Sequence, residues 1–221
     1  MAGCSYRIDS AHSQAMAIDM AADVLQSGGL VLFPSDTVYV VASLARTGES
    51  VSNGLDRLFA VKNRGRGPSF PWLVGSPSDL DVYGTGVTDD ARTLAENLWP
   101  CGLTIVVRAS SAVPRVLARE DGSVALRCSA APIAAGLIRS CGLPLISTGA
   151  NSHGNRPPCT YGEVADDVMS SVDFAIEDPA VSLPGRSTIV DCTTRQTSIL
   201  REGVVSRESV DGALGIVTPF V

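Results

Sequence analysis

Apolar positions recur at helical spacing near the start of the chain. Between residues 12 and 27, Met16, Met20 and Val24 fall at four-residue intervals, and Ala17, Ala21 and Leu25 form a second stripe beside them. The acidic residues of this segment lie elsewhere on the helical projection, which predicts an amphipathic helix. The two glycines at positions 28 and 29 are expected to end it.

Short apolar runs, many rich in β-branched residues, alternate with further helical patterns. The expected strands are Leu30–Phe33, Phe70–Val74, Leu103–Val107, Val124–Arg127, Leu143–Ile146, Ser187–Asp191 and Ser198–Arg201. The other expected helices are Ser50–Lys62, one capped by Thr88 that runs to Leu98, and one that begins at Pro132 and stops at Gly142, and Thr160–Glu163 has the spacing of a capping box. This alternation predicts an α/β fold with a mixed sheet, arranged as one domain over residues 1–221.

Composition narrows the classes of function. The 221 residues carry a net charge of −6, which argues against a protein that grips DNA or duplex RNA through phosphates, although a small basic cavity remains compatible. No apolar run is long enough to span a bilayer and no secretory h-region opens the chain, so we expect no membrane association and a cytoplasmic location. The six cysteines lack zinc-like spacing, and only two histidines are present. We therefore expect reduced thiols and no protein metal site.

The chain has one lysine, Lys62, and Arg64 follows two residues later. An ammonium and a planar guanidinium side by side suit an anion with several oxygens. The plainer alternative is that Lys62 closes a helix, where a cation complements the helix dipole. Taken alone, these two residues favour the plainer alternative. Walker A, dinucleotide-binding glycine and nucleophile-elbow patterns are all lacking.

Seven segments, considered together and in their order along the chain, decide between the two explanations of Lys62. They are Phe33–Tyr39, Lys62–Arg64, Trp99–Thr104, Val124–Arg127, Ser147–Gly154, Ser187–Asp191 and Arg201–Gly203. Their order and spacing resemble the YrdC/Sua5 family of threonylcarbamoyl-adenylate synthases, and the resemblance covers a core of about residues 12–206. It implies a twisted mixed β-sheet with flanking helices around a deep electropositive cavity.

The resemblance also implies a reaction. Members of the family join L-threonine, bicarbonate and ATP, with Mg²⁺, into threonylcarbamoyl-AMP and release pyrophosphate, so the expected class is a nucleotidyltransferase. A separate tRNA-modifying complex then uses the product to make N6-threonylcarbamoyladenosine. Such chemistry gathers several negative charges, and catalysis is mostly positioning and charge neutralisation.

Residue roles follow from the resemblance, position by position. The expected catalytic residues, which would hold phosphate and carbonate oxygens, are Lys62, Arg64 and Arg127. Residues expected to bind the amino-acid substrate are Ser35, Thr37, Tyr39, Thr104 and Asn151. Residues expected to bind the nucleotide are Lys62, Arg64, Thr148, Asn151, His153, Ser187 and Arg201. Each also has a plainer explanation as a strand-end, turn or capping residue.

The chain departs from the family pattern at several motif positions. The departures are Val40 and Gly149 where glycine and serine are usual, Gly65 and Pro68 in place of proline and lysine, Cys101-Gly102 in place of Gly-Pro, and His153 in place of serine. A branched side chain at position 40 would reshape the amino-acid pocket, and a histidine adds a group that titrates near neutral pH. Two alternatives therefore stay open: carbamoyl-adenylate or carbamoyl-transfer chemistry on another amine or acceptor in specialised metabolism, and a non-catalytic nucleotide- or RNA-binding module.

Overall fold

The computed structural model describes residues 4–46, 49–62, 70–152, 154–179, 181 and 183–216. Its elements are β1 (Cys4–Arg7), α1 (Ala11–Gln26), β2 (Val31–Pro34), β3 (Tyr39–Leu44), α2 (Glu49–Val61), β4 (Trp72–Val74), α3 (Asp79–Tyr83), α4 (Asp89–Leu98), β5 (Leu103–Arg108), β6 (Ser123–Cys128), α5 (Pro132–Cys141), β7 (Leu145–Gly149), a 3₁₀ turn (Tyr161–Glu163), α6 (Asp166–Met169), β8 (Phe174–Glu177), β9 (Thr188–Asp191), β10 (Ser198–Arg201) and α7 (Arg207–Ala213). None of the helices described is both long enough and apolar enough to cross a membrane.

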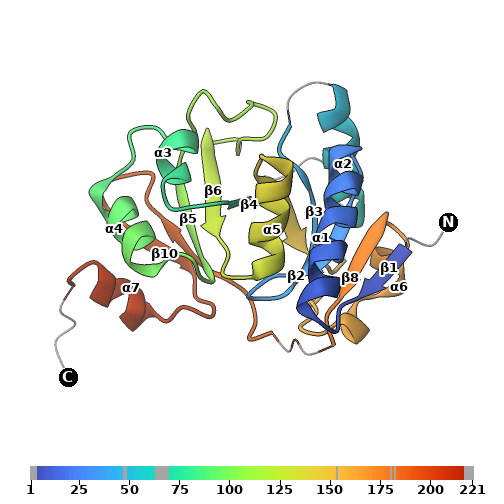
Figure 1. Ribbon diagram of the computed structural model, residues 1–221. Coiled ribbons are helices and arrows are strands. Elements are labelled where there is room, and N and C mark those ends of the chain that lie inside the picture. Colours follow the sequence, from blue (N-terminus) through green and yellow to red (C-terminus); the bar gives the residue numbers. More distant parts are fainter. Residues whose placement is uncertain are drawn as a thin grey trace.

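The described strands form one mixed sheet, which confirms the predicted α/β class. Its order is β1-β8-β2-β3-β7-β4-β6-β5-β9-β10, with β1 and β10 at opposite edges (Figure 1). The sheet contains both parallel pairs, such as β4–β6 and β5–β9, and antiparallel pairs, such as β3–β7 and β5–β6. Segments far apart in the chain therefore become neighbours in the sheet, and their side chains meet on a shared face.

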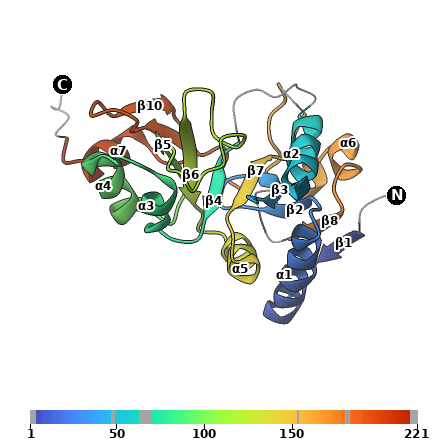
Figure 2. The same cartoon turned by 90° about the horizontal axis from the view of Figure 1, so that it is seen from above.

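Helices cover both faces of the sheet. α1 and α5 lie on one side of β2, β3 and β8, and α2 and α6 lie on the other side (Figure 2). The buried stripe of α1 is Ala17, Ala21 and Leu25, whereas Met16 and Met20 remain 44% and 39% exposed. The stripe of Ala17, Ala21 and Leu25 is therefore the buried face of α1, rather than the methionine stripe, and its two alanines allow close packing.

Two helix ends follow the predicted chemistry. The Thr88 side chain accepts a hydrogen bond from the Ala91 backbone N–H and so caps α4. Pro132 occupies the first turn of α5, and Gly142 ends it with a left-handed φ of 66°. The expected capping box at Thr160 is wrong: its side chain makes no capping bond, and Glu163 instead accepts a hydrogen bond from the Cys159 N–H.

The strand β7 lies further along the chain than its predicted position. We expected Leu143–Ile146, but β7 runs over Leu145–Gly149. Pro144 belongs to the turn after α5, where its carbonyl accepts a hydrogen bond from the Ala45 N–H. The pattern also did not reveal β1, β3, β8 or the short helices α3, α6 and α7. The six side chains of β3 are all buried, so they show no alternation of apolar and polar residues.

Candidate functional site

A cavity of about 530 Å³ opens on one face of the sheet. Alternate residues of neighbouring strands build its wall, including Thr104 and Val106 of β5 and Ala125 and Arg127 of β6. Val106 and Ala125 are direct cross-strand partners, so they share this face. The β-sheet register therefore decides which side chains the cavity receives.

The described cavity wall is strongly cationic although the whole protein is acidic. It carries Lys62, Arg119, Arg127, Arg186 and Arg201, and no aspartate or glutamate occurs among its described residues. The chain as a whole has a net charge of −6. Concentrating cations in a cavity favours an anionic ligand with several oxygens. Arg119 and Arg186 belong to none of the recognised motifs, and no signal in the sequence distinguished them from other loop arginines.

Most of the residues expected at the site meet at this cavity. Its lining includes Thr37, Lys62, Thr104, Arg127, Thr148, Asn151, Ser187 and Arg201. Ser35 and Tyr39 are described but do not line it. Arg64 and His153 lie outside the described residues, as do Gly65 and Pro68, so their expected roles remain predictions.

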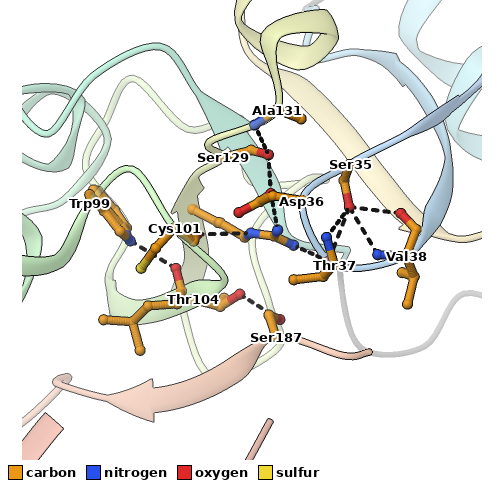
Figure 3. A network of polar contacts seen from close by, with 12 residues as sticks. Ser35, Asp36, Thr37, Val38, Trp99, Cys101, Thr104, Ser129, Ala131 and Ser187 are labelled. Carbon is orange, nitrogen blue, oxygen red and sulfur yellow. Dashed lines mark hydrogen bonds and ion pairs between the residues drawn. The ribbon is translucent and has the colours of Figure 1, made fainter. Parts of the chain in front are cut away.

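Arg127 is the most deeply buried cation of the described cavity wall. Its guanidinium donates to the Asp36 carboxylate, to the Thr37 hydroxyl at 2.8 Å and to the Cys101 carbonyl at 3.3 Å. The Ser129 hydroxyl donates to the same Asp36 oxygen (Figure 3). Burial lowers the pKa of Arg127, and the Asp36 carboxylate opposes that shift. The pair fixes the guanidinium in place at the cavity wall.

Ser35 shapes the turn that presents Thr37. Its hydroxyl accepts hydrogen bonds from the Thr37 and Val38 N–H groups and donates to the Val38 carbonyl at 2.7 Å (Figure 3). Ser35 is only 3% exposed. Because its oxygen is occupied by the turn, Ser35 positions the cavity residue Thr37 rather than lining the cavity itself.

Tyr39 points away from the cavity. Side chains alternate along the extended chain, so Val38, just before β3, and Val40 face the cavity while the Tyr39 ring enters the core on the opposite side. The Tyr39 hydroxyl accepts a hydrogen bond from the Asp178 N–H at 3.1 Å and donates to the Asp178 carbonyl. Burial raises the pKa of Tyr39 to about 12. The expectation that its side chain contacts the amino acid is therefore replaced by a core role.

Lys62 holds the turn that follows β7. Its ammonium donates to the Gly149 carbonyl, the Asn151 carbonyl and the Asn151 side-chain oxygen, each at 2.7 Å. The Asn151 amide group donates in turn to the carbonyls of Ser152 and Asn155. Three convergent acceptors match the three donors of an ammonium. Lys62 follows the last residue of α2, so the helix end and the 149–151 turn are tied together beside the cavity.

Arg201 and Ser187 form a second polar group on the wall. The Arg201 guanidinium donates twice to the Ser187 carbonyl and once to its hydroxyl. The Ser187 and Thr104 hydroxyls lie 3.0 Å apart (Figure 3). Burial lowers the pKa of Arg201, and the charges of Arg186 and Arg127 lower it further. The mutual repulsion of these arginines would be relieved by a bound anion.

The described residues contain no group of three or more histidine, cysteine, aspartate or glutamate side chains that could hold a metal ion. The oxygen atoms offered by the described wall are those of hydroxyls, side-chain amides and backbone carbonyls. Such ligands bind Mg²⁺ weakly unless phosphates supply most of its coordination.

One family model matches most of this chain. A model of the Sua5, YciO and YrdC proteins, described as telomere recombination, matches residues 23–203. The chain belongs to the Sua5/YciO/YrdC family. The match begins within α1 and ends just after β10, so it includes every described strand of the sheet except β1.

Named relatives of this Sua5/YciO/YrdC chain are similar over most of its length. A threonylcarbamoyl-AMP synthase of Pyrococcus abyssi is 30% identical over 90% of this chain and 57% of its own length. A putative threonylcarbamoyl-AMP synthase of Mycobacterium tuberculosis is 31% identical over 89% of this chain and 88% of its own length. The chain therefore spans little more than half of the first relative and most of the second.

A solved structure agrees with the family assignment. The crystal structure of Pyrococcus abyssi Sua5 complexed with L-threonine has a TM-score of 0.85 and 28% identity to this chain. It covers 97% of this chain, and this chain covers 61% of that protein. The similarity extends to the whole sheet, which confirms the twisted mixed sheet with flanking helices.

Proposed function

We propose that this protein is an ATP-dependent threonylcarbamoyl-AMP synthase that uses L-threonine and bicarbonate and releases pyrophosphate. The observation that carries the proposal is the cavity with five cations and no described carboxylate on its wall. Family membership and the names of the relatives support it. The corresponding class is a nucleotidyltransferase, and the product would pass to a tRNA-modifying complex.

The proposed reaction needs this kind of wall. The amine nitrogen of L-threonine forms a C–N bond with the bicarbonate carbon, and water leaves. An oxygen of the resulting carbamate attacks the α-phosphorus of ATP, the bond to the β-phosphate oxygen breaks, and pyrophosphate leaves with the electron pair. Carbamate, carboxylate and triphosphate are all anionic, so bringing them together requires fixed positive charge.

The cations that belong to the recognised motifs would each serve one part of this assembly. Arg201 and Ser187 would hold the nucleotide, and Arg127 with Thr37 and Thr104 would hold the amino-acid and carbonate side. The turn at Asn151, which Lys62 supports, would bring Asn151 and Thr148 to the phosphates. Arg64 would add a second guanidinium there, and His153 would lie next to the nucleotide.

Mg²⁺ would accompany ATP. When bound, it would neutralise phosphate charge and orient the triphosphate. The described hydroxyl and amide oxygens of the wall fit an ion that phosphates mainly coordinate. The chain's own arginines would therefore do the remaining neutralisation.

A second candidate is the same carbamoyl-adenylate chemistry on another amine. The observation that favours it is Val40, a branched side chain on the cavity wall, where the family pattern usually has glycine. Added bulk at the wall changes the space left for the substrate side chain.

One experiment tests both candidates. The purified protein is supplied with ATP, Mg²⁺, bicarbonate and a panel of amino acids and other amines, and pyrophosphate release and the adenylated product are measured, the latter by mass spectrometry. We expect threonylcarbamoyl-AMP with L-threonine. Turnover only with another amine would support the second candidate, and ATP binding without turnover on any amine would contradict both.

A further inference from the structure

The cations of the cavity differ in how many hydrogen bonds and ion pairs they make with other groups of the protein. Lys62 donates to three oxygens, Arg127 pairs with a carboxylate, and Arg201 donates three times to Ser187. Arg186 makes one long bond, at 3.3 Å, to the Asn155 carbonyl. Among the described residues, these contacts give Arg186 and Arg201 no carboxylate partner, so their positive charges are not neutralised by an ion pair.

Among the described residues, Arg119 is the cavity cation with the fewest side-chain hydrogen bonds and ion pairs. In the part of the chain that the structure describes, its half-buried guanidinium makes no hydrogen bond or ion pair, yet it lines the cavity. The nearby carboxylate is Asp121, whose pKa the Arg119 charge helps to lower. Asp121 is exposed, and it already accepts hydrogen bonds from the Ser123 N–H and hydroxyl, at 2.9 and 2.6 Å. Asp121 forms no ion pair with Arg119, and because it is exposed it is a solvent-screened counterion.

The backbone places Arg119 at one end of the cavity wall. Its N–H donates to the Ser123 carbonyl at 2.8 Å, so the loop closes onto the first residue of β6. Arg127 lies four residues after Ser123 in β6, so the backbones of these two residues are roughly 13 Å apart at the usual rise of a strand. The apolar partners Val106 and Ala125 lie between the two arginines. The backbone of Arg119 thus lies at the start of β6 and that of Arg127 near its end, with the apolar cavity residue Ala125 between them in the strand.

We propose that Arg119 is a substrate-binding residue that pairs through its planar fork with an oxyanion group of the bound ligands. This inference rests on the proposed function, whose anionic ligands are ATP, the amino acid and bicarbonate, and we assign Arg119 to the triphosphate of ATP or to the carboxylate of the amino acid. A half-buried guanidinium with no internal anion partner presents its donors to a ligand without first breaking a protein contact. Arg127 differs because Asp36 already neutralises it.

Arg119→Gln tests the proposal, with Arg119→Lys as the conservative variant. Arg115→Gln is the matched control, because Arg115 is exposed in the same loop and does not line the cavity. Dissociation constants for ATP–Mg²⁺ and for L-threonine are measured by titration calorimetry, and KM values are measured for both substrates. Losing a charge-assisted contact should raise one of these constants roughly 10- to 100-fold, with a smaller rise in Arg119→Lys.

The two substrates distinguish the two sources of the oxyanion. A rise confined to ATP–Mg²⁺ identifies a phosphate, and a rise confined to L-threonine identifies the carboxylate. Unchanged constants for both substrates in Arg119→Gln, or an equal rise in Arg115→Gln, would overturn the proposal. A lower urea midpoint with unchanged binding would also overturn it, because Arg119 would then only support the loop.

The same measurements separate this proposal from the proposed function. If the unmutated protein binds ATP–Mg²⁺ but forms no adenylate, the synthase assignment fails, and the ATP titrations of Arg119→Gln and Arg115→Gln still decide the role of Arg119. If the unmutated protein binds neither substrate, both proposals are overturned.

Discussion

Val40 and Gly149 are direct cross-strand partners, on β3 and β7 respectively. A Cβ atom at Gly149 would lie 2.9 Å from the Asn151 side-chain oxygen and 3.1 Å from Pro157 Cβ. The family pattern has glycine at position 40 and serine at position 149. In this chain the side chain of the pair is therefore on position 40, as valine, and position 149 is glycine. The turn after β7 is packed closely around the glycine, and the neighbouring strand fills the wall with valine.

Gly149→Ser should therefore disturb the turn. The new Cβ would displace Asn151 Oδ1, which accepts a hydrogen bond from Lys62. We expect a loss of roughly 1–3 kcal/mol in the free energy of unfolding, together with reduced adenylate formation. Urea denaturation and pyrophosphate release measure the two effects. Gly162→Ser is the control, since a Cβ there would meet nothing within 4 Å; a Gly149→Ser protein as stable and active as this control would contradict the packing argument.

Val40→Ala should change substrate preference. Removing two methyl groups from a buried cavity side chain enlarges the space at the wall and costs about 1–2 kcal/mol of stability. We expect the ratio of kcat/KM between L-threonine and a bulkier amino acid to move toward the bulkier one. Val41→Ala is the control, because Val41 is equally buried but belongs to the core on the other face. The same change of ratio in both variants would exclude a direct role for Val40.

Asp36→Asn should leave a buried cation without its counterion. The side chains of Arg127 and Asp36 are only 6% and 15% exposed. Breaking such a pair from one side costs about 3 kcal/mol, and we expect adenylate formation to fall as the guanidinium loses its fixed position. Asp81→Asn is the control, because its pair with Arg92 is 57% and 40% exposed. The exposed pair should contribute at most about 1 kcal/mol, and equal losses in chemical denaturation would contradict the difference in burial.

Lys62→Ala should abolish nucleotide turnover while the protein remains folded. The variant removes the side chain of Lys62, which joins the end of α2 to the oxygens of Gly149 and Asn151. Lys62→Arg should rescue little, because a planar fork cannot satisfy three convergent acceptors. Circular dichroism reports folding, and pyrophosphate release reports turnover. Full activity in Lys62→Ala would remove this residue, and the turn it holds, from the site.

Asp173 should make stability fall in acid. Its carboxylate accepts hydrogen bonds from the Leu30 N–H and the Arg57 guanidinium. Partial burial raises its pKa, but the hydrogen bonds and charge of these partners outweigh burial, so the pKa is lowered overall. A lowered folded-state pKa contributes stability that is complete above the unfolded value of about 3.9 and is lost as pH falls through the folded value.

Asp173→Asn tests that linkage. We expect the variant to lose about 1 kcal/mol at pH 7, a modest figure because the pair is partly exposed. Its stability should also decline less than that of the unmutated protein between pH 5 and pH 3. Urea midpoints at several pH values measure both effects. Parallel pH profiles for the two proteins would show that Asp173 has the same affinity for protons in the folded and unfolded states.

The limits of sequence-based prediction are visible at particular residues. Thr37, Tyr39 and Ser35 were expected together because they share one segment, yet only Thr37 reaches the cavity. Strand alternation turns the Tyr39 ring into the core, and a tight turn occupies the Ser35 hydroxyl. Adjacent positions in a motif need not share a face, since successive side chains of a strand point in opposite directions.

Local patterns in this sequence were sufficient for the elements whose determinants are local. The amphipathic period of α1, the Thr88 cap and the Pro132–Gly142 boundaries of α5 depend on neighbouring residues, and these predictions agree with the structure. The order of the motifs also sufficed to recognise the family. The cavity cations Arg119 and Arg186 could not be recognised in this way. They reach the wall only because non-consecutive strands pair in one register and curl the sheet, and that pairing depends on contacts between residues distant in the chain.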